Sequence, residues 1–313
     1  MKKNRKINIA FAGTPEIAFN IFEELSKKDF QINFILTQTD KKAGRGAQLK
    51  SSKFLEKKET YSVLQPENLN DNDFKKIILN QSIDLLIVVA YGKILPSWLL
   101  EHPKYGCLNV HFSILPKWRG AAPMQRAIAN GDKSFGVSFM KIEEKLDTGG
   151  IYKTISTNNH SQDIYRLEKK LVEITNMNLS NTIIEICSEK IIPETQEEEK
   201  ATYADKVSKE EGLINWNINS SQIFRNFLAF KRWPGSYFKF NDELVRVINM
   251  ENIKTITGNP GEISSFNKDG MTVCCQKGAV NLKSVQFPGK KVISSNDFFN
   301  SKRDIISFEE DLI

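Results

Sequence analysis

The sequence predicts an α/β fold: an N-terminal Rossmann-like, mostly parallel sheet with helices on both faces, followed by a small C-terminal β-barrel. In residues 1–189 short apolar runs alternate with amphipathic helical segments, which is the pattern of a parallel sheet. In residues 210–313 short β-like segments are separated by turn residues. The 313 residues, 40% hydrophobic and 26% charged, are enough for two domains with ordinary cores.

The chain begins with a predicted βαβ unit. Residues 7–12 read as a buried strand, and a Gly-Thr-Pro turn leads into a helix with Pro15 at its first position and an apolar face over residues 17–25. A second strand follows over residues 32–36, so a right-handed crossover is expected. The turn lacks the G-x-G-x-x-G spacing that brings a backbone close to a pyrophosphate, so no NAD or flavin site is predicted.

The next segment is strongly basic. Residues 41–58 contain one acid, Glu56, and the following basic residues: Lys41, Lys42, Arg45, Lys50, Lys53, Lys57 and Lys58. Arg45 stands between two glycines, so we expect a mobile loop there. Two interpretations stay open. The segment is either a solvated charged connection, or a loop whose Arg45 fork contacts phosphate oxygens.

Two further strands are predicted to end side by side. Asp71 is a candidate cap for a helix over residues 74–79, and the apolar run 83–90 is typical of a central parallel strand. A short helix near residues 98–101 then leads into a strand over residues 106–111. Because open α/β sheets bind ligands at the carboxyl ends of their strands, these two ends should border one crevice.

The second of these strands carries a candidate catalytic pair, Asn109 and His111. Side chains two positions apart on a strand share a face, so an amide donor should lie beside an imidazole. The amide can hydrogen-bond a developing oxyanion and the imidazole can move a proton, which suits attack on a carbonyl. The alternative is that both polar groups only satisfy loop backbone at a strand end.

Asp147 lies in a Lys-Leu-Asp-Thr-Gly-Gly loop. It is either an ordinary turn residue, or a carboxylate beside His111 that fixes the imidazole tautomer or takes up a proton. A long amphipathic helix that begins at Ser161 or Asp163 should then close the first domain, residues 1–189.

The remaining chain divides into a linker, residues 190–209, and a C-terminal domain, residues 210–313. The linker is polar and holds Pro193, so it reads as an extended connection whose charges are solvated. Ser221 is the candidate cap of an apolar helix. Five segments with turn signals between them predict the small barrel: residues 237–240, 244–250, 261–265, 271–275 and 279–285.

Composition argues against several classes of protein. The four cysteines show no C-x-x-C spacing and the three histidines are scattered, so we predict neither a metal site nor a disulfide framework. The apolar run after the basic first residues is too short for a signal peptide, and no run reaches membrane-spanning length. We therefore expect a cytoplasmic protein with no membrane partner. The net charge of +6 is compatible with an anionic partner without proving one.

A series of ordered motifs runs along nearly the whole chain. The first domain contains Phe-Ala-Gly-Thr-Pro at 11–15, Gly-Arg-Gly at 44–46, Val-Val-Ala-Tyr-Gly at 88–92, Asn-x-His at 109–111, Ser-Ile-Leu-Pro at 113–116, Trp-Arg-Gly-Ala-Ala-Pro at 118–123 and Leu-Asp-Thr-Gly at 146–149. Beyond it stand Ala-Thr-Tyr-Ala-x-Lys at 201–206, Trp-Pro-Gly at 233–235 and Phe-Pro-Gly-Lys at 287–290. Together these motifs resemble the folate-dependent formyltransferases, and within them the methionyl-tRNA formyltransferase family.

The resemblance implies transfer of the formyl group of 10-formyltetrahydrofolate to the α-amine of methionine on initiator tRNA, with Asn109, His111 and Asp147 at the reacting carbon. It implies a folate pocket made by Val89, Ala90, Tyr91, Gly92, Ser113, Ile114, Leu115 and Pro116. It also implies that Arg45, Lys41, Lys42 and Lys50 hold the acceptor end of the tRNA. The C-terminal barrel should be OB-like and bind tRNA. The folate is the expected co-substrate, with no metal, and the chain should be a monomer without an obligatory protein partner.

The sequence departs from the family pattern around the basic loop. Thr39, Lys42 and Ser52 stand where prolines usually flank Gly-Arg-Gly, and this should loosen the loop. The Asn, His and Asp set alone is shared by all folate-dependent formyltransferases. A sugar nucleotide or another small amine is therefore the alternative acceptor, and the basic loop and the second domain argue against it.

Overall fold

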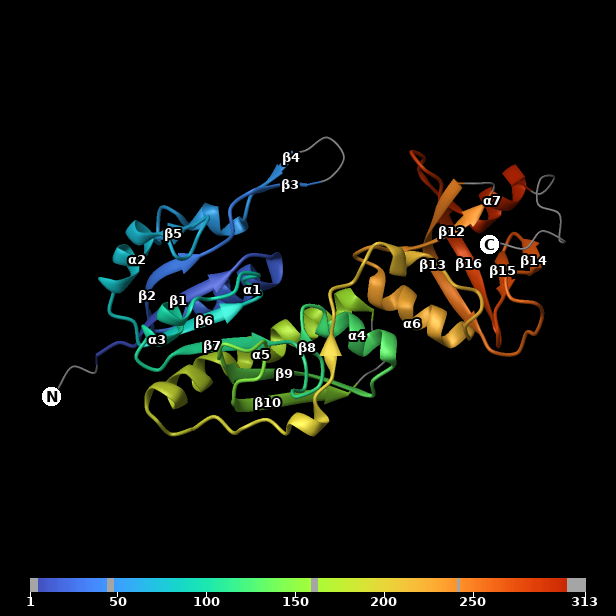
Figure 1. Ribbon diagram of the computed structural model, residues 1–313. Coiled ribbons are helices and arrows are strands. Elements are labelled where there is room, and N and C mark those ends of the chain that lie inside the picture. The colour runs from blue at the N-terminus through green and yellow to red at the C-terminus, as the bar shows by residue number, and fades with distance from the viewer. Residues whose placement is uncertain (1–4, 44–47, 159–162, 241–242, 303–313) are drawn as a thin grey trace. The chain divides into compact units, whose positions relative to one another are not determined.

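The computed structural model of the chain describes residues 5–43, 48–158, 163–240 and 243–302. The chain forms two compact units (Figure 1). The first comprises residues 1–120, 134–158 and 168–203, and the second comprises residues 121–133, 159–167 and 204–313.

The first unit is built around a seven-stranded sheet with the strand order β10-β9-β7-β6-β1-β2-β5. Its strands are β1 (Asn8–Gly13), β2 (Gln31–Leu36), β5 (Val63–Leu64), β6 (Leu85–Val89), β7 (Cys107–His111), β9 (Ser134–Lys141) and β10 (Ile151–Asn158). The pairs from β5 through β7 are parallel, whereas β9 and β10 pair antiparallel at one edge. The predicted mostly parallel sheet is confirmed, with an edge strand, β10, that was not predicted.

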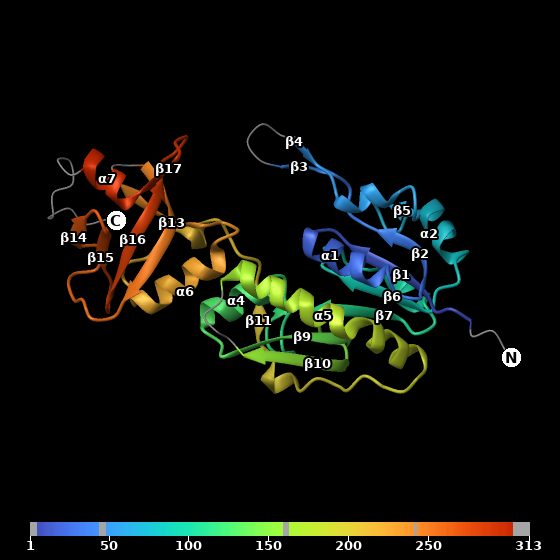
Figure 2. The same ribbon diagram turned by 180° about the vertical axis from the view of Figure 1, so that it is seen from behind.

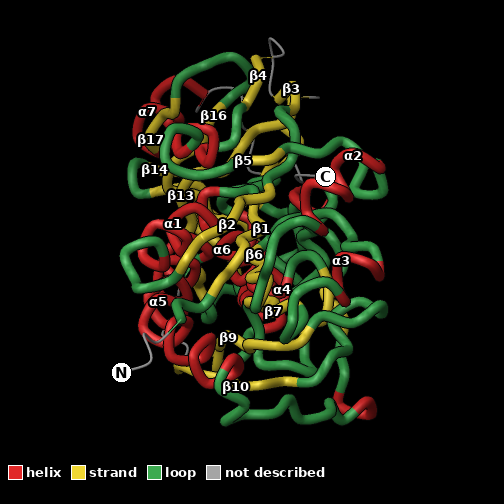
Figure 3. Tube along the Cα trace, turned by 90° about the vertical axis from the view of Figure 1, so that its left-hand side faces the viewer, coloured by secondary structure: helices red, strands yellow, loops and turns green. Residues whose placement is uncertain are grey.

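Helices cover both faces of this sheet, as predicted. They are α1 (Glu16–Leu25), α2 (Asn72–Leu79), α3 (Ser97–Glu101) and α5 (Ile164–Cys187), with a 3-10 turn, η1, at Lys53–Lys57. Phe11 of β1 packs its ring 5.3 Å from that of Phe22 in α1, whereas the neighbouring Ala10 and Ala12 face the cluster that contains Phe74 of α2. Strand side chains alternate between faces, so one strand serves both layers. In Figure 3, α1 and α5 lie on one side of the strands and α2 and α3 on the other.

Local signals explain where α2 begins. The Asp71 side chain accepts hydrogen bonds from the backbone N–H groups of Asp73 (3.1 Å) and Phe74 (2.9 Å). These are donors that have no partner within the helix, and a short polar side chain satisfies them best. The predicted cap is confirmed.

The basic segment contains a small hairpin. Strands β3 (Lys41–Ala43) and β4 (Gln48–Lys50) pair antiparallel, and Figures 1 and 2 show them projecting from the first unit beyond β2. Gly44, Arg45 and Gly46 lie outside the described residues, as do the side chains of residues 41–50.

The second unit is an antiparallel β domain, as predicted. Its sheet has the order β12-β13-β16-β15-β14, with β17 paired to β16. The strands are β12 (Ser236–Phe240), β13 (Glu243–Ile253), β14 (Ile263–Asn267), β15 (Gly270–Cys274), β16 (Ala279–Gln286) and β17 (Val292–Ser294), and the helices are α4 (Pro123–Asn130), α6 (Ser220–Phe230) and α7 (Ser295–Lys302). A cluster rich in phenylalanine, including Phe238, Phe266 and Phe298, fills its core. Strand β17 is only three residues long and was not predicted.

The prediction that Ser221 caps α6 is wrong. Asn219 is the cap, and its side chain accepts a hydrogen bond from the backbone N–H of Gln222 at 2.8 Å. Ser221 lies within the first turn of the helix. Asn and Ser cap helices about equally well, so the sequence alone could not choose between the candidates.

The segment over residues 190–209 is more ordered than an extended connection. It contains a 3-10 turn, η2 (Glu198–Lys200), and strand β11 (Tyr203–Ala204), which pairs with β8 (Arg119–Gly120); a further turn, η3 (Glu210–Gly212), follows. Gln196 is buried, and Glu198 forms an ion pair with the buried Arg119. The expectation that the charges of this segment are merely solvated is therefore wrong for Glu198.

Three further findings concern the described part of the chain. The four cysteines, Cys107, Cys187, Cys274 and Cys275, are free thiols. In the described residues there is no group of three or more His, Cys, Asp or Glu side chains that could hold a metal ion. Among the helices that the structure describes, none combines the length and the apolar character needed to span a membrane.

Candidate functional site

Strand β7 places Asn109 and His111 in the middle of the sheet. Asn109 pairs with Val88 of β6 on one side and with Met140 of β9 on the other, and His111 pairs with Ser138. The two residues are separated by one position, so their side chains share a face of the strand. In the described part of the chain, the half-buried Asn109 amide has no hydrogen-bond partner, so its N–H groups are available to a ligand.

The imidazole of His111 is held through one ring nitrogen. Its Nε2 lies 2.9 Å from the carbonyl oxygen of Trp118. A carbonyl only accepts hydrogen bonds, so Nε2 carries a hydrogen and donates it. The other nitrogen, Nδ1, lies 3.7 Å from Oδ2 of Asp147. The ring is 5% exposed and is therefore fixed by packing as well as by this bond.

Asp147 reaches His111 from a separate loop. Its backbone adopts a left-handed conformation with φ of 52°, which residues other than glycine rarely adopt. Its Oδ2 accepts a hydrogen bond from the backbone N–H of Gly120 at 2.8 Å. The structure therefore brings the Asp147 carboxylate beside His111, and the role of the carboxylate there stays a prediction.

The Ser113–Pro116 segment forms a tightly bonded turn after β7. The hydroxyl of Ser113 donates to the carbonyl of Lys117 at 2.6 Å, and Ser138 bridges the segment by donating to the Ser113 carbonyl at 2.8 Å and accepting from the Leu115 N–H at 3.1 Å. Leu115 is buried, the Leu115–Pro116 bond is cis, and Ile114 is half-buried. The polar groups of this segment therefore shape the loop, and Ile114 and Pro116 are its partly exposed members.

The segment after β6 is arranged differently from the simple expectation. The side chains of Val89 and Tyr91 are buried, and burial raises the pKa of Tyr91 to about 12. Ala90 and Gly92 are exposed and have positive φ values of 46° and 78°. The structure therefore offers backbone and small side chains to a ligand at this point, while Val89 and Tyr91 pack inside.

Gln38 is a residue that sequence reasoning missed at this end of the sheet. Its amide donates to the Tyr91 carbonyl at 2.7 Å, and the hydroxyl of Thr14 donates to the same oxygen at 3.0 Å. A Cβ on Gly92 would lie 2.4 Å from Nε2 of Gln38. These contacts tie together the ends of β1, β2 and β6, and no motif in the sequence marks Gln38.

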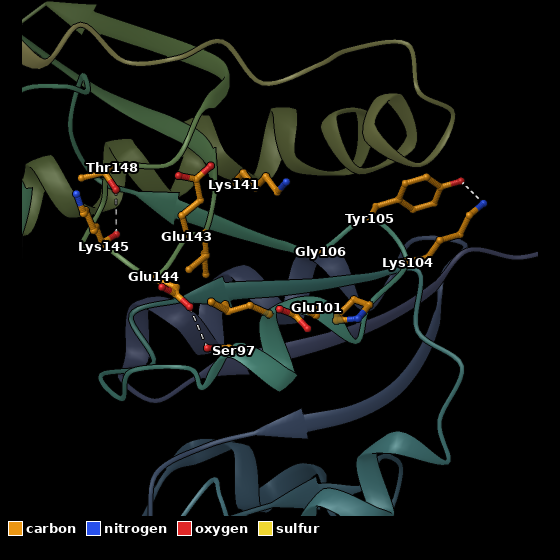
Figure 4. Close-up of a pocket in the computed structure, with 13 residues that line it drawn as sticks. Ser97, Glu101, Lys104, Tyr105, Gly106, Lys141, Glu143, Glu144, Lys145 and Thr148 are labelled. Atoms are coloured by element: carbon orange, nitrogen blue, oxygen red, sulfur yellow. Dashed lines mark hydrogen bonds between the residues drawn. The ribbon is translucent and has the colours of Figure 1, made fainter.

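A cavity of about 770 Å³ lies beside the Asp147 loop (Figure 4). Its walls come from α3 (Ser97, Leu100), from the segment that ends at Gly106 just before β7, and from the loop that contains Thr148, the neighbour of Asp147. Ser97 donates to Glu144 across it at 3.1 Å. A volume of this size is ordinary for a small-molecule site. None of the eight residues named for the folate pocket lines it.

The basic residues of the 41–58 segment separate into two groups. Lys53 and Lys57 form ion pairs with Glu16 and Glu23 of α1, both at 2.5 Å, and the pairing with Glu16 raises the pKa of Lys53. Lys41, Lys42 and Lys50 belong to the hairpin, whose side chains are not described, and Arg45 lies outside the described residues. The interpretation that Arg45 contacts phosphate stays a prediction.

The segment over residues 196–202 contributes contacts that the sequence did not reveal. The Arg119 guanidinium has no exposed side-chain surface, donates from Nε to Oε1 of Gln196 at 3.1 Å and pairs with Glu198 at 2.8 Å. The Gln196 amide also donates to the backbone carbonyl of Asp147. Arg119 belongs to the Trp-Arg-Gly motif, whose sequence does not indicate these contacts, and Gln196 stands in a polar stretch without a distinguishing signal.

Comparisons with known proteins agree with this architecture. Residues 5–183 match the family model described as formyl transferase, and residues 206–303 match that of the formyl transferase C-terminal domain. A methionyl-tRNA formyltransferase from Buchnera aphidicola subsp. Schizaphis graminum (strain Sg) is 36% identical over 304 residues, which cover 96% of this chain and 97% of the relative.

Two solved structures show the same fold at low identity. HypX from Aquifex aeolicus gives a TM-score of 0.66 at 15% identity, covering 97% of this chain and 49% of HypX, so the chain spans about half the length of that protein. An N-formyltransferase from Helicobacter canadensis, solved with folinic acid and dTDP-3-aminofucose, gives a TM-score of 0.67 at 19% identity over 88% of this chain and 98% of that one.

Proposed function

The chain belongs to the methionyl-tRNA formyltransferase family, and we propose that it transfers the formyl group of 10-formyltetrahydrofolate to the α-amino group of methionine on initiator tRNA. The product, formylmethionyl-tRNA, serves translation initiation. One observation supports the chemistry above all: Nδ1 of His111 lies 3.7 Å from the Asp147 carboxylate, and the same strand as His111 carries Asn109, whose amide has no hydrogen-bond partner among the described residues.

The reaction is a direct transfer between two nitrogens. The α-amine attacks the formyl carbon, the carbonyl oxygen takes up the negative charge, and the bond from that carbon to N10 then breaks. The amine loses one proton and N10 gains one, so the protons balance without a covalent enzyme intermediate. The protein must therefore stabilise an oxyanion and move a proton.

We assign the oxyanion to Asn109 and His111. Asn109 donates from its side-chain amide. Because the Nε2 hydrogen of His111 is held by Trp118, His111 donates from Nδ1 and must carry both ring hydrogens to do so. The Asp147 carboxylate stabilises that cation and, through a water molecule, accepts the proton that the amine sheds.

The folate co-substrate belongs, in this proposal, at the crevice where β6 and β7 end. The exposed backbone of Ala90 and Gly92 and the partly exposed Ile114 and Pro116 are the members of the expected pocket that a ligand can reach. The cavity of about 770 Å³ is not part of this crevice, because residues 103–106, which precede the amino end of β7, line it, and none of the expected pocket residues does.

Residues 1–189 form the proposed catalytic domain, residues 190–209 the linker and residues 210–313 the tRNA-binding domain. Arg45, Lys41, Lys42 and Lys50 are proposed to hold the acceptor end of the tRNA, because Lys41, Lys42 and Lys50 belong to a β-hairpin that projects beyond β2, and Arg45 stands between its two strands in the sequence. Lys53 and Lys57 are left out of this set, since both already pair with glutamates of α1.

Radiolabelled formyl transfer tests the proposal. Purified protein is given labelled 10-formyltetrahydrofolate with charged initiator tRNA, charged elongator tRNA or a dTDP-amino sugar. We expect label on the methionine of the initiator tRNA, no label without the folate, and none on the sugar. Formylation of the amino sugar with no label on tRNA would replace the proposed acceptor.

A further inference from the structure

We propose that Gln196 is a positioning residue for the formyl transfer: its side-chain amide holds the Asp147 loop in the conformation that brings the carboxylate to His111. The inference rests on the proposed function. Gln196 lies outside the helices and strands, about fifty residues along the chain from Asp147, and it is 8% exposed.

Both N–H groups and the oxygen of the Gln196 side-chain amide form hydrogen bonds within the protein. Its Nε2 donates to the carbonyl of Asp147 at 2.9 Å and to the carbonyl of Gly149 at 2.7 Å, while its Oε1 accepts from Nε of Arg119 at 3.1 Å. Carbonyls only accept and a guanidinium only donates, so the orientation of the amide is unambiguous.

The two carbonyls flank a strained turn. Asp147 has a left-handed backbone, which its side chain disfavours, and such conformations persist only where the surroundings hold them. The Gln196 amide clamps the carbonyls on either side of Thr148 and so fixes the direction in which the Asp147 side chain leaves the loop.

The same segment also fixes the other side of the site. The Thr202 carbonyl accepts from the N–H of Arg119 at 2.8 Å, and its hydroxyl accepts from the N–H of Trp118 at 2.9 Å. Trp118 in turn supplies the carbonyl that holds Nε2 of His111. Two residues of one stretch of chain therefore act on the two sides of the site. Gln196 holds the Asp147 loop, and Thr202 holds the backbone of Trp118, which bonds His111.

Arg119 holds the Gln196 side chain in place. Its guanidinium is fully buried: Nη1 donates to Oε1 of Glu198 at 2.9 Å, and Nη2 lies 2.8 Å from Oε2 in the ion pair. Because Glu198 holds Arg119 in place, rotation of the Gln196 side chain would leave the buried Nε of Arg119 without its acceptor. The amide is thus a rigid link between Arg119 and the Asp147 loop.

Gln196→Glu separates the positioning role from folding. The carboxylate still accepts from Arg119, but it has no N–H to give to Asp147 and Gly149, and it faces their carbonyls with a negative charge. We expect kcat for formyl transfer to fall by about 10- to 100-fold, the usual effect of losing a residue that orients a reacting group. Glu197→Gln is the matched control, because Glu197 is mostly exposed and pairs with Lys200; we expect wild-type kcat.

A double-mutant cycle with Asp147→Asn distinguishes positioning from general structural damage. If Gln196 acts through Asp147, adding Gln196→Glu to Asp147→Asn lowers kcat little further. Losses that multiply, or a Gln196→Glu variant with wild-type kcat, would overturn the inference. If Gln196→Glu does not fold, Thr202→Val is the second variant, because it removes the exposed hydroxyl that holds Trp118. We expect a smaller fall in kcat, which is likewise non-additive with Asp147→Asn. An additive fall would count against the role of residues 196–202. A wild-type protein without formyl transfer would instead refute the proposed function itself.

Discussion

Replacing Asn109 tests whether its amide stabilises the oxyanion. Loss of one such donor typically lowers kcat by about 100- to 1000-fold, or roughly 3 to 4 kcal/mol in the activation free energy. We expect the loss in kcat and not in folding. The side chain is half-buried and has no hydrogen-bond partner in the described chain, so Asn109→Ala orphans no buried group. The free energy of unfolding should change by less than about 1 kcal/mol.

The assay is single-turnover transfer of labelled formyl to charged initiator tRNA, beside urea unfolding. Asn109→Asp keeps the side-chain volume but cannot donate, and we expect it to be as impaired as Asn109→Ala. Asn158→Ala is the control, because Asn158 is an exposed residue at the end of the edge strand β10 of the same sheet. If Asn109→Ala transfers formyl at a rate close to that of the wild type, the oxyanion assignment is wrong.

Three other perturbations follow from individual contacts. Arg119→Met should lower the free energy of unfolding by about 1 to 3 kcal/mol, since it leaves the buried Gln196 oxygen unpaired. Glu198→Gln should also lower it, since the buried guanidinium then loses the charge of its partner carboxylate, and an unchanged urea melt of either variant would contradict this. The hydrogen bond from Arg126 lowers the pKa of Glu211 below its usual 4.5, so this pair stabilises the fold above that pH. The free energies of unfolding of the wild type and of Glu211→Gln should therefore converge as the pH falls below the folded-state pKa of Glu211. Arg45→Ala should weaken use of charged tRNA and flatten its salt dependence without changing folate binding; an unchanged salt slope would favour a merely solvated loop.

The strands of the first sheet were predictable where burial on both faces gives continuous apolar runs. The run over residues 83–90 contains β6, and the strand over residues 106–111 contains β7. Strand β10 was not predicted because it is an edge strand. Its side chains are mostly exposed or half-exposed, so its sequence carries no continuous apolar run. Edge strands of this kind take their structure from the neighbour they pair with.

The residues of the candidate site could be named from the sequence, whereas the contacts that hold them in place could not. Asn109 and His111 share a face because a strand alternates, and this needs no tertiary information. The approach of Asp147 depends on a left-handed turn and on contacts from Gln196, which lies in a polar stretch with no periodicity. Tyr91 was named for the folate pocket from its motif, and its ring packs inside the core, which the motif did not indicate.

The most direct test is the single-turnover rate of formyl transfer to charged initiator tRNA by Asp147→Asn. The amide oxygen of the variant can still accept from the Gly120 N–H, so the loop keeps its anchor, while the negative charge beside His111 is lost. We expect the rate to fall by at least about 100-fold, as loss of acid–base function typically does. A correctly folded Asp147→Asn protein that transfers formyl as fast as the wild type would show that the pairing of His111 with Asp147 does not carry the reaction.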